Sequence, residues 1–129
     1  MDVLIVENDL IVTKMWSKKL SKKHSVRVAE SVDRAKEEIA NKTPDLVILD
    51  LRLNGPKHSG LNVYEFIRKG LNGNIPIIFV TGLAYSVDLF QRAEAFVKSD
   101  LSRGVKTSLV EKPVRINTLF DMVNQEAAA

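Results

Sequence analysis

Five polar residues stand at the ends of short apolar runs, and their side chains have the chemistry needed to bind phosphate. They are Glu7 and Asn8, Asp50, Thr81 and Lys112. Carboxylate and amide oxygens that lie close together repel one another unless a cation separates them, and such hard ligands suit Mg²⁺ or Mn²⁺. Lysine supplies a positive charge for a phosphoryl group, and threonine supplies a neutral donor. A carboxylate in this setting could become an aspartyl phosphate.

Asp50 follows the stretch that most clearly predicts a buried strand. Four consecutive apolar residues, Leu46 to Leu49, lie between Asp45 and Asp50. The run is too short to span a membrane and too continuous for a strand with one wet face, so we predict a central parallel strand covered on both faces. Ligands of open α/β sheets bind at the carboxyl edge, where Asp50 falls. Its carboxylate is therefore the first candidate for chemistry.

Strand and helix patterns alternate five times along the chain. The expected strands cover residues 3–6, 25–29, 46–49, 75–80 and 107–110. Apolar stripes at helical spacing follow them, led by Val12, Trp16 and Leu20, then Val32, Ala35 and Ile39, and later Leu61 to Leu71, Leu89 to Leu101, and Ile116 to Val123. Asn8 or Asp9 can cap the first helix, and Ser31 the second. This alternation predicts an α/β fold with a doubly wound parallel sheet and helices on both faces.

In such a sheet, the carboxyl ends of the strands lie on one edge. Glu7 and Asn8 follow the first strand, Asp50 the third, Thr81 the fourth and Lys112 the fifth. Each residue also has a purely structural interpretation, as a helix cap, a strand terminus or an exposed side chain before a turn. The convergence of four strand ends favours a shared site.

Composition limits the remaining choices. A chain of 129 residues with 45% apolar and 27% charged residues predicts one globular domain over residues 1–129. It contains no cysteine, which excludes disulfides, thiolate metal sites and a cysteine nucleophile. No basic leader opens the chain and no run approaches about 18 apolar residues, so we expect a cytoplasmic protein without membrane insertion.

The net charge of +3 is modest. Lys14, Lys18 and Lys22 recur every four residues, which is typical of a solvated helix face. Docking of a kinase is an alternative interpretation of this face. We expect no direct contact with nucleic acid.

Four motifs together resemble the receiver domain of two-component response regulators, of the single-domain type. They are VLIVEND at residues 3–9, LVILDLRL at 46–53, IIFVTG at 77–82 and VEKPV at 110–114. They occur in the family's order and span essentially the whole chain. The resemblance implies a five-stranded parallel sheet of flavodoxin-like order 2-1-3-4-5 with five helices.

The resemblance also implies a role for each polar residue. Asp50 would accept a phosphoryl group from a sensor histidine kinase or a phosphotransfer protein. Mg²⁺ would be held by Glu7, Asn8, Asp50 and the backbone carbonyl of Arg52. Thr81 matches the switch hydroxyl, and Lys112 matches the lysine that pairs with the phosphoryl group.

Further expectations concern the turn after the last strand and the readout. The Lys112–Pro113 bond is usually cis in this family. The fourth helix, fifth strand and fifth helix would present the phosphorylation state to a downstream protein target, and a homodimer through the same surface is a further expectation. A protein of this kind is a phosphorelay component and not a turnover enzyme.

The sequence departs from the family pattern at four points, of which Asn8 and Leu109 favour an alternative, a pseudo-receiver that binds proteins without control by phosphorylation. Asn8 replaces the usual aspartate of the metal pair, although Asp9 could compensate, and Leu109 replaces an aromatic residue three positions before the lysine. The loop at 52–60 and the interval between Thr81 and Lys112 are longer than usual. Tyr85 suggests a subgroup of stand-alone receivers. A flavodoxin-like cofactor binder is disfavoured, because no glycine-rich loop follows the first strand.

Overall fold

The strands of this protein form one parallel sheet. In the computed structural model, which describes residues 1–53, 59–70, 73–82 and 87–128, the strands are β1 (Asp2–Val6), β2 (Ser25–Ala29), β3 (Leu46–Asp50), β4 (Ile77–Thr81) and β5 (Thr107–Glu111). They pair in the order β2-β1-β3-β4-β5, always parallel. The described residues also form α1 (Leu10–Leu20), α2 (Val32–Asn41), α3 (Ser59–Lys69), α4 (Val87–Ser102) and α5 (Ile116–Ala128). The predicted doubly wound fold, with its strand order, is confirmed.

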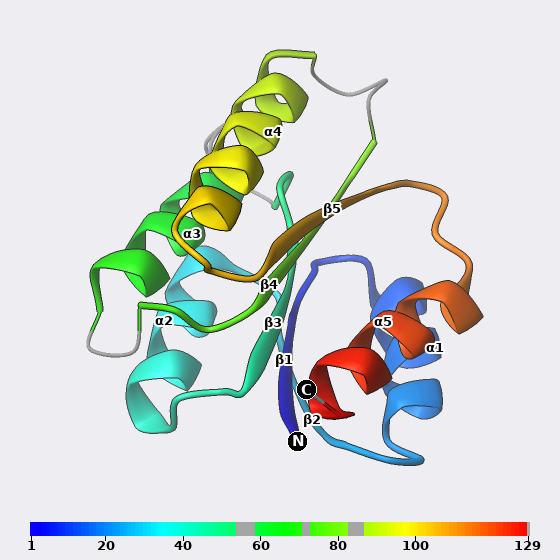
Figure 1. The fold of residues 1–129 in the computed structure, drawn as a ribbon. Coiled ribbons are helices and arrows are strands. Elements are labelled where there is room, and N and C mark those ends of the chain that lie inside the picture. Colours follow the sequence, from blue (N-terminus) through cyan, green and yellow to red (C-terminus); the bar gives the residue numbers. More distant parts are fainter. Residues whose placement is uncertain (54–58, 71–72, 83–86, 129) are drawn as a thin grey trace.

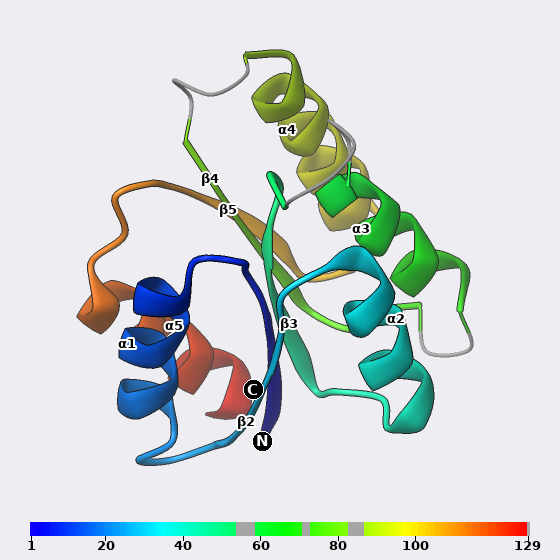
Figure 2. The same ribbon diagram turned by 180° about the vertical axis from the view of Figure 1, so that it is seen from behind.

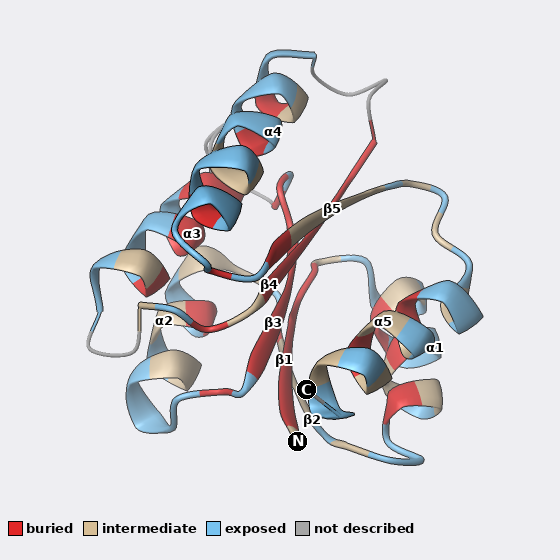
Figure 3. Cartoon of the chain, in the orientation of Figure 1, coloured by how far each residue is buried: buried red, intermediate tan, exposed pale blue. Residues whose placement is uncertain are grey.

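The helices cover the two faces of the sheet unequally. Helices α1 and α5 lie on one face, and α2, α3 and α4 lie on the other (Figures 1 and 2). Each face has its own apolar core, because alternate side chains of a strand point to opposite faces. In β1, Leu4 and Val6 face α2, α3 and α4, whereas Val3 and Ile5 face α1 and α5. The three central strands are buried along their length, as Figure 3 shows.

Helices α1 and α2 each begin with a residue type that is favoured as an N-cap. Asp9 caps α1, where its Oδ1 accepts hydrogen bonds from the amides of Ile11 at 2.9 Å and Val12 at 3.3 Å. Ser31 caps α2. Of the two candidates for the first cap, the structure uses Asp9 and leaves Asn8 in the turn after β1.

Two local predictions differ from the structure. Strand β4 begins at Ile77 and not at Ile75, and Pro76 has no amide proton to donate to a neighbouring strand. Phe66, assigned from its spacing to the apolar stripe of α3, is 38% exposed, with the ammonium of Lys36 5.6 Å from the centre of its ring. Leu71, the last residue of that stripe, lies outside the described residues. In the described part of the chain, no helix combines the length and apolar character required to cross a bilayer.

Gly60 allows the first turn of α3 to pack against the end of β3. A Cβ atom at this position would lie 2.5 Å from the backbone oxygen of Asp50 and 2.5 Å from the Cα of Leu51. The Gly60 amide donates to the Leu51 carbonyl at 3.2 Å. The close approach therefore depends on the missing side chain, and it sets the position of the backbone that carries Asp50.

We predict that Gly60→Ala lowers the free energy of unfolding by about 1–3 kcal/mol, because the new methyl group would clash with backbone atoms, and backbone atoms can move aside only at a high cost in energy. Urea unfolding measures the change. Gly70→Ala is the matched control, since a Cβ there would lie 3.4 Å from its nearest neighbours. Equal losses in the two variants would contradict this explanation.

Candidate functional site

Glu7, Asp50 and Lys112 meet because each continues the alternation of its strand. The residues two positions earlier are Ile5, Ile48 and Val110, which all belong to the core under α1 and α5. The ladder extends past the strand ends, where the Glu7 amide donates to the Ala29 carbonyl at 3.1 Å and the Lys112 amide to the Thr81 carbonyl at 2.8 Å. All three side chains therefore leave the carboxyl edge of the sheet on the same side.

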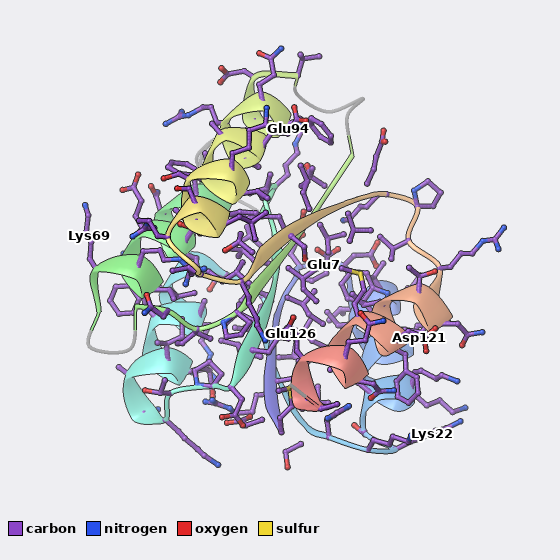
Figure 4. The ribbon with its side chains drawn as sticks, in the orientation of Figure 1. Glu7, Lys22, Lys69, Glu94, Asp121 and Glu126 are labelled. Carbon is purple, nitrogen blue, oxygen red and sulfur yellow. The ribbon has the colours of Figure 1, made fainter. Side chains whose placement is uncertain are left out.

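The ammonium of Lys112 lies between two carboxylates. Its Nζ is 3.2 Å from Glu7 Oε1 and 3.5 Å from Asp50 Oδ2. Glu7 is 1% exposed and Asp50 is 3% exposed, whereas the side chain of Lys112 is 25% exposed. Figure 4 shows Glu7 in the interior of the molecule, while Lys22 and Lys69 extend outward. One positive charge thus faces two almost fully buried acidic groups.

The remaining predicted site residues surround this group. The Arg52 amide donates to Asp50 Oδ1 at 3.1 Å. Thr81 is buried at the end of β4, one residue beyond Val80, which pairs with Asp50 across the sheet. Asn8 is half-buried and directly follows Glu7. Hydrogen bonds and ion pairs thus join Glu7, Asp50, Lys112 and the Arg52 amide, while the chain and the strand register place Asn8 and Thr81 beside them. The Lys112–Pro113 bond is cis, as expected.

Asp9 does not take the place of the aspartate that Asn8 replaces. Its carboxylate is exposed and accepts two amides of α1, so it faces the helix and not the site. The compensation that the sequence suggested for Asp9 is therefore not seen. The acidic side chains of the site are Glu7 and Asp50.

Burial and proximity change the acidity of these groups. Burial, together with a hydrogen bond and repulsion from Asp50, raises the pKa of Glu7 from its ordinary value of 4.5 to about 8, although Lys112 opposes the change. Burial also acts to lower the pKa of Lys112, but attraction to Asp50 and Glu7 outweighs it, and that pKa is raised. At neutral pH, Lys112 is therefore charged and Glu7 tends to hold a proton.

The oxygen atoms of this group of side chains fit a hard cation. Because residue 8 is Asn and not Asp, the group carries one negative charge fewer than three carboxylates would give. Glu7 Oε2 is buried and has no hydrogen-bond partner among the described residues. A cation or a proton would relieve this oxygen. The described ranges contain no group of three or more His, Cys, Asp and Glu side chains placed to hold a metal. Oxygen donors from Glu7, Asn8, Asp50 and the Arg52 carbonyl suit Mg²⁺ or Mn²⁺.

The other departures found in the sequence have different outcomes. Leu109, in β5, is half-buried and packs on the core beneath α2, α3 and α4. Helix α4 is 16 residues long, and it lies in the extended interval between Thr81 and Lys112. Residues 54–58 of the lengthened loop, and Tyr85, lie outside the described residues.

Sequence reasoning did not single out Asp100, a fully buried carboxylate in α4. Asp100 continues the buried stripe of α4 that includes Leu89 and Ala93. An acidic residue at a position that helical spacing assigns to the core is the signal that the sequence offers for it. Apart from Arg103, which directly follows the helix, its partners come from α3 and β5, and spacing within one helix could not reveal those.

The chain belongs to the family of response regulator receiver domains. The family model for the response regulator receiver domain matches residues 3–124.

A curated relative is the nitrogen assimilation regulatory protein NtrX of Azorhizobium caulinodans, 29% identical over 82 residues. The match covers 63% of this chain but 18% of that protein, which is much longer. A signal receiver domain from Vibrio parahaemolyticus superposes with a TM-score of 0.78 at 25% identity, covering 97% of this chain and 88% of the other. The receiver domain of NtrX from Brucella abortus gives a TM-score of 0.75 at 23% identity, with 99% of both chains covered. The chain is therefore a receiver domain in fold and family.

We predict that the metal-free protein loses stability as the pH rises from about 5 to about 8. Between the ordinary pKa of Glu7 and its raised folded value, the folded state binds more protons than the unfolded state, so deprotonation favours unfolding. Glu7→Gln removes this titration with little change in shape. The variant should therefore show a flatter profile and should exceed the wild type in stability near pH 8, as measured by urea unfolding in chelator.

Glu37→Gln serves as the control, because the side chain of Glu37 is 58% exposed. Its profile should follow that of the wild type. If Glu7→Gln instead followed the wild type at every pH, the raised pKa would be wrong.

Proposed function

We propose that this receiver domain takes part in a phosphorelay in which Asp50 accepts a phosphoryl group. The single observation that supports this best is the ammonium of Lys112 at 3.2 Å from Glu7 and 3.5 Å from Asp50. One carboxylate oxygen of Asp50 forms the new bond to phosphorus, while the bond to the donor nitrogen breaks and its electron pair stays on the departing imidazole. Lys112 offsets the added negative charge, and the Thr81 hydroxyl donates a hydrogen bond to the phosphoryl group.

We propose Mg²⁺, or Mn²⁺ in its place, as the cofactor of this reaction. Its ligands would be the side chains of Glu7, Asn8 and Asp50 and the backbone carbonyl of Arg52. The cation would reduce the repulsion between the phosphoryl oxygens and Asp50. The partnerless Oε2 of Glu7 is the structural observation that favours a cation here.

The phosphodonor is a sensor histidine kinase or a phosphotransfer protein. The first turns of α1 begin directly after the metal-binding turn and expose apolar side chains, with Leu10 68%, Ile11 79% and Met15 47% exposed. Lys14 and Lys18 lie among them and are also exposed. Exposed apolar residues that cluster beside a site are typical of a surface that binds another protein. We assign this surface to the phosphodonor.

The output is a change in the binding of a downstream protein at the face formed by α4, β5 and α5. Strand β5 is the edge of the sheet, and a groove of about 410 Å³ lies between it and the carboxyl ends of α4 and α5. A homodimer through this face is part of the same proposal. The protein acts in the cytoplasm as a phosphoacceptor, without multiple turnover and without direct nucleic-acid contact.

The principal test is phosphorylation by a small donor. Incubation with Mg²⁺ and acetyl phosphate should add the mass of one phosphoryl group to the intact protein, and Asp50→Ala should abolish the addition. Asp45→Ala is the matched control, because Asp45 lies at the opposite end of β3 and accepts the Asp2 amide. It should be phosphorylated like the wild type.

The same experiment separates the proposal from its alternative. If the wild type gains no mass with Mg²⁺ or Mn²⁺ present, the chain is a pseudo-receiver that binds proteins without phosphorylation. Asn8 and Leu109 are the residues that favour that alternative. Mass gained equally by Asp50→Ala would instead place the acceptor elsewhere.

Asn8→Asp should tighten Mg²⁺ binding by about tenfold, because affinity for hard cations increases with the number of charged ligands. Isothermal titration calorimetry measures the change near pH 7. Asn8→Ala, which removes the oxygen altogether, should weaken binding. Unchanged affinity in both variants would show that residue 8 is not a ligand.

A further inference from the structure

The positive charge of this chain is concentrated on one surface. Residues 10–29 contain six Lys and Arg residues and no Asp or Glu, which leaves 13 basic and 16 acidic residues elsewhere, a net charge of −3 for the rest of the chain. Arg27 pairs with Asp2 and Glu38. The other five basic residues, the basic patch, lie in α1 and in the turn after it, and they are Lys14, Lys18, Lys19, Lys22 and Lys23.

The basic patch has no acidic partner in the described part of the chain. None of its five ammonium groups forms an ion pair with a described carboxylate. The ammonium groups of Lys19 and Lys23 lie 4.9 Å and 5.8 Å from the centre of one ring, that of Phe120 in α5. The ring attracts both cations but cannot neutralise them. An anionic partner would supply the negative charge that balances the patch.

The stability of α1 explains only part of this charge. Lys18 and Lys19 occupy the last turn of the helix, where cations interact favourably with the helix dipole. Lys14 lies on an earlier turn and four residues before Lys18, a spacing at which like charges destabilise a helix. Lys22 lies beyond the end of α1 and extends outward (Figure 4). Contact with a partner explains these two lysines better than helix stability does.

Exposed apolar side chains lie on the same outer face of α1 as the lysines. Positions 11, 14, 15 and 18 follow helical spacing, and they carry apolar Ile11 and Met15 together with two lysines of the patch. Ile11 is 79% exposed and Met15 is 47% exposed, and Leu10 beside them is 68% exposed. The outer face of α1 is therefore aliphatic toward its amino end and cationic toward its carboxyl end.

We propose that the outer face of α1 binds the surface of an anionic phospholipid bilayer. The side chains of Leu10, Ile11 and Met15 enter the headgroup region, where apolar surface leaves water. The ammonium groups of the basic patch contact lipid phosphates, because the long stems of lysine can lie beside apolar groups while their charged ends reach the headgroups. Helix α1 lies flat on the bilayer and does not cross it.

A nucleic acid would match the charge of the basic patch but not its neighbours. Single strands bind to exposed aromatic rings on which their bases stack. Trp16 of α1 is only 3% exposed, and Phe120 is half-buried with two ammonium groups over its ring. Aliphatic side chains are stabilised by lipid and not by phosphate groups. The combination of lysines with aliphatic side chains therefore favours the bilayer.

The bilayer and the phosphodonor would share Leu10, Ile11 and Met15, so α1 cannot bind both at once. A receiver bound to the membrane through α1 must therefore leave it before a donor protein reaches Asp50. This exclusion rests on the proposed function, whereas the membrane contact does not.

Sedimentation with lipid vesicles tests the inference on the unphosphorylated full chain. The wild type should sediment with vesicles of equal parts phosphatidylglycerol and phosphatidylcholine, and it should stay in solution with phosphatidylcholine alone. High salt should weaken the binding, because it screens exposed charges. Lys22→Gln combined with Lys23→Gln should lower the partition coefficient by about tenfold or more. Ile11→Ser should lower it by about fivefold or more, because less apolar surface leaves water.

Lys69→Gln combined with Lys98→Gln is the matched control. Both lysines are exposed, and they lie in α3 and α4, on the other face of the sheet. This variant should bind like the wild type. An equal loss in the control would show that net charge and not the basic patch determines binding, and it would overturn the inference.

Three further outcomes would also overturn the inference. The first is a wild type that does not sediment with anionic vesicles, and the second is unchanged binding by Ile11→Ser. The third is binding of a single-stranded RNA in place of vesicles, lost in the variant of Lys22 and Lys23, which would assign the patch to nucleic acid. Phosphorylation by acetyl phosphate requires no vesicles, so the proposed function and the membrane contact can fail separately.

Discussion

A single ammonium group, that of Lys112, faces two carboxylates that are almost completely removed from water. Buried acidic groups are tolerated in proteins only when they are paired, protonated or bound to a cation. Burial and the neighbouring Asp50 raise the pKa of Glu7, and the one lysine that the two carboxylates share opposes this rise only in part. The pairing also brings the ends of β1, β3 and β5 together. Asp50 is the last residue of β3, and Glu7 and Lys112 directly follow β1 and β5.

The site could be predicted from the sequence to the extent that it follows from strand alternation. Continuous apolar runs identify β1, β3 and β4, and side chains at even spacing leave a strand on the same side. That rule puts Glu7, Asp50 and Lys112 on the same side of a parallel sheet, and the strand order then decides how close together they lie. The order of the strands came from resemblance to a family, because the run lengths do not specify which strands are neighbours.

What could not be predicted depends on contacts between distant parts of the chain. Either Asn8 or Asp9 could cap α1, and only the path of the turn after β1 decides in favour of Asp9. The partners of Asp100 from other elements are residues 64, 68 and 107, and no periodic pattern connects them. Phe66, which is 38% exposed, could not be placed correctly from spacing either. Helical spacing identifies an apolar stripe, but it does not show which residues at the edge of the stripe are exposed to solvent.

The cap formed by Asp9 lies between the buried acidic site and the exposed apolar start of α1. Only the half-buried Asn8 separates the acidic Glu7 from the residue whose carboxylate fixes the first turn of α1. Under the proposed function, a cation bound by Asn8 would lie beside the start of that helix and the exposed side chains of Leu10 and Ile11. Metal binding and recognition of the donor protein would then be coupled through the turn after β1, and loss of the ion would alter the surface that the donor protein meets.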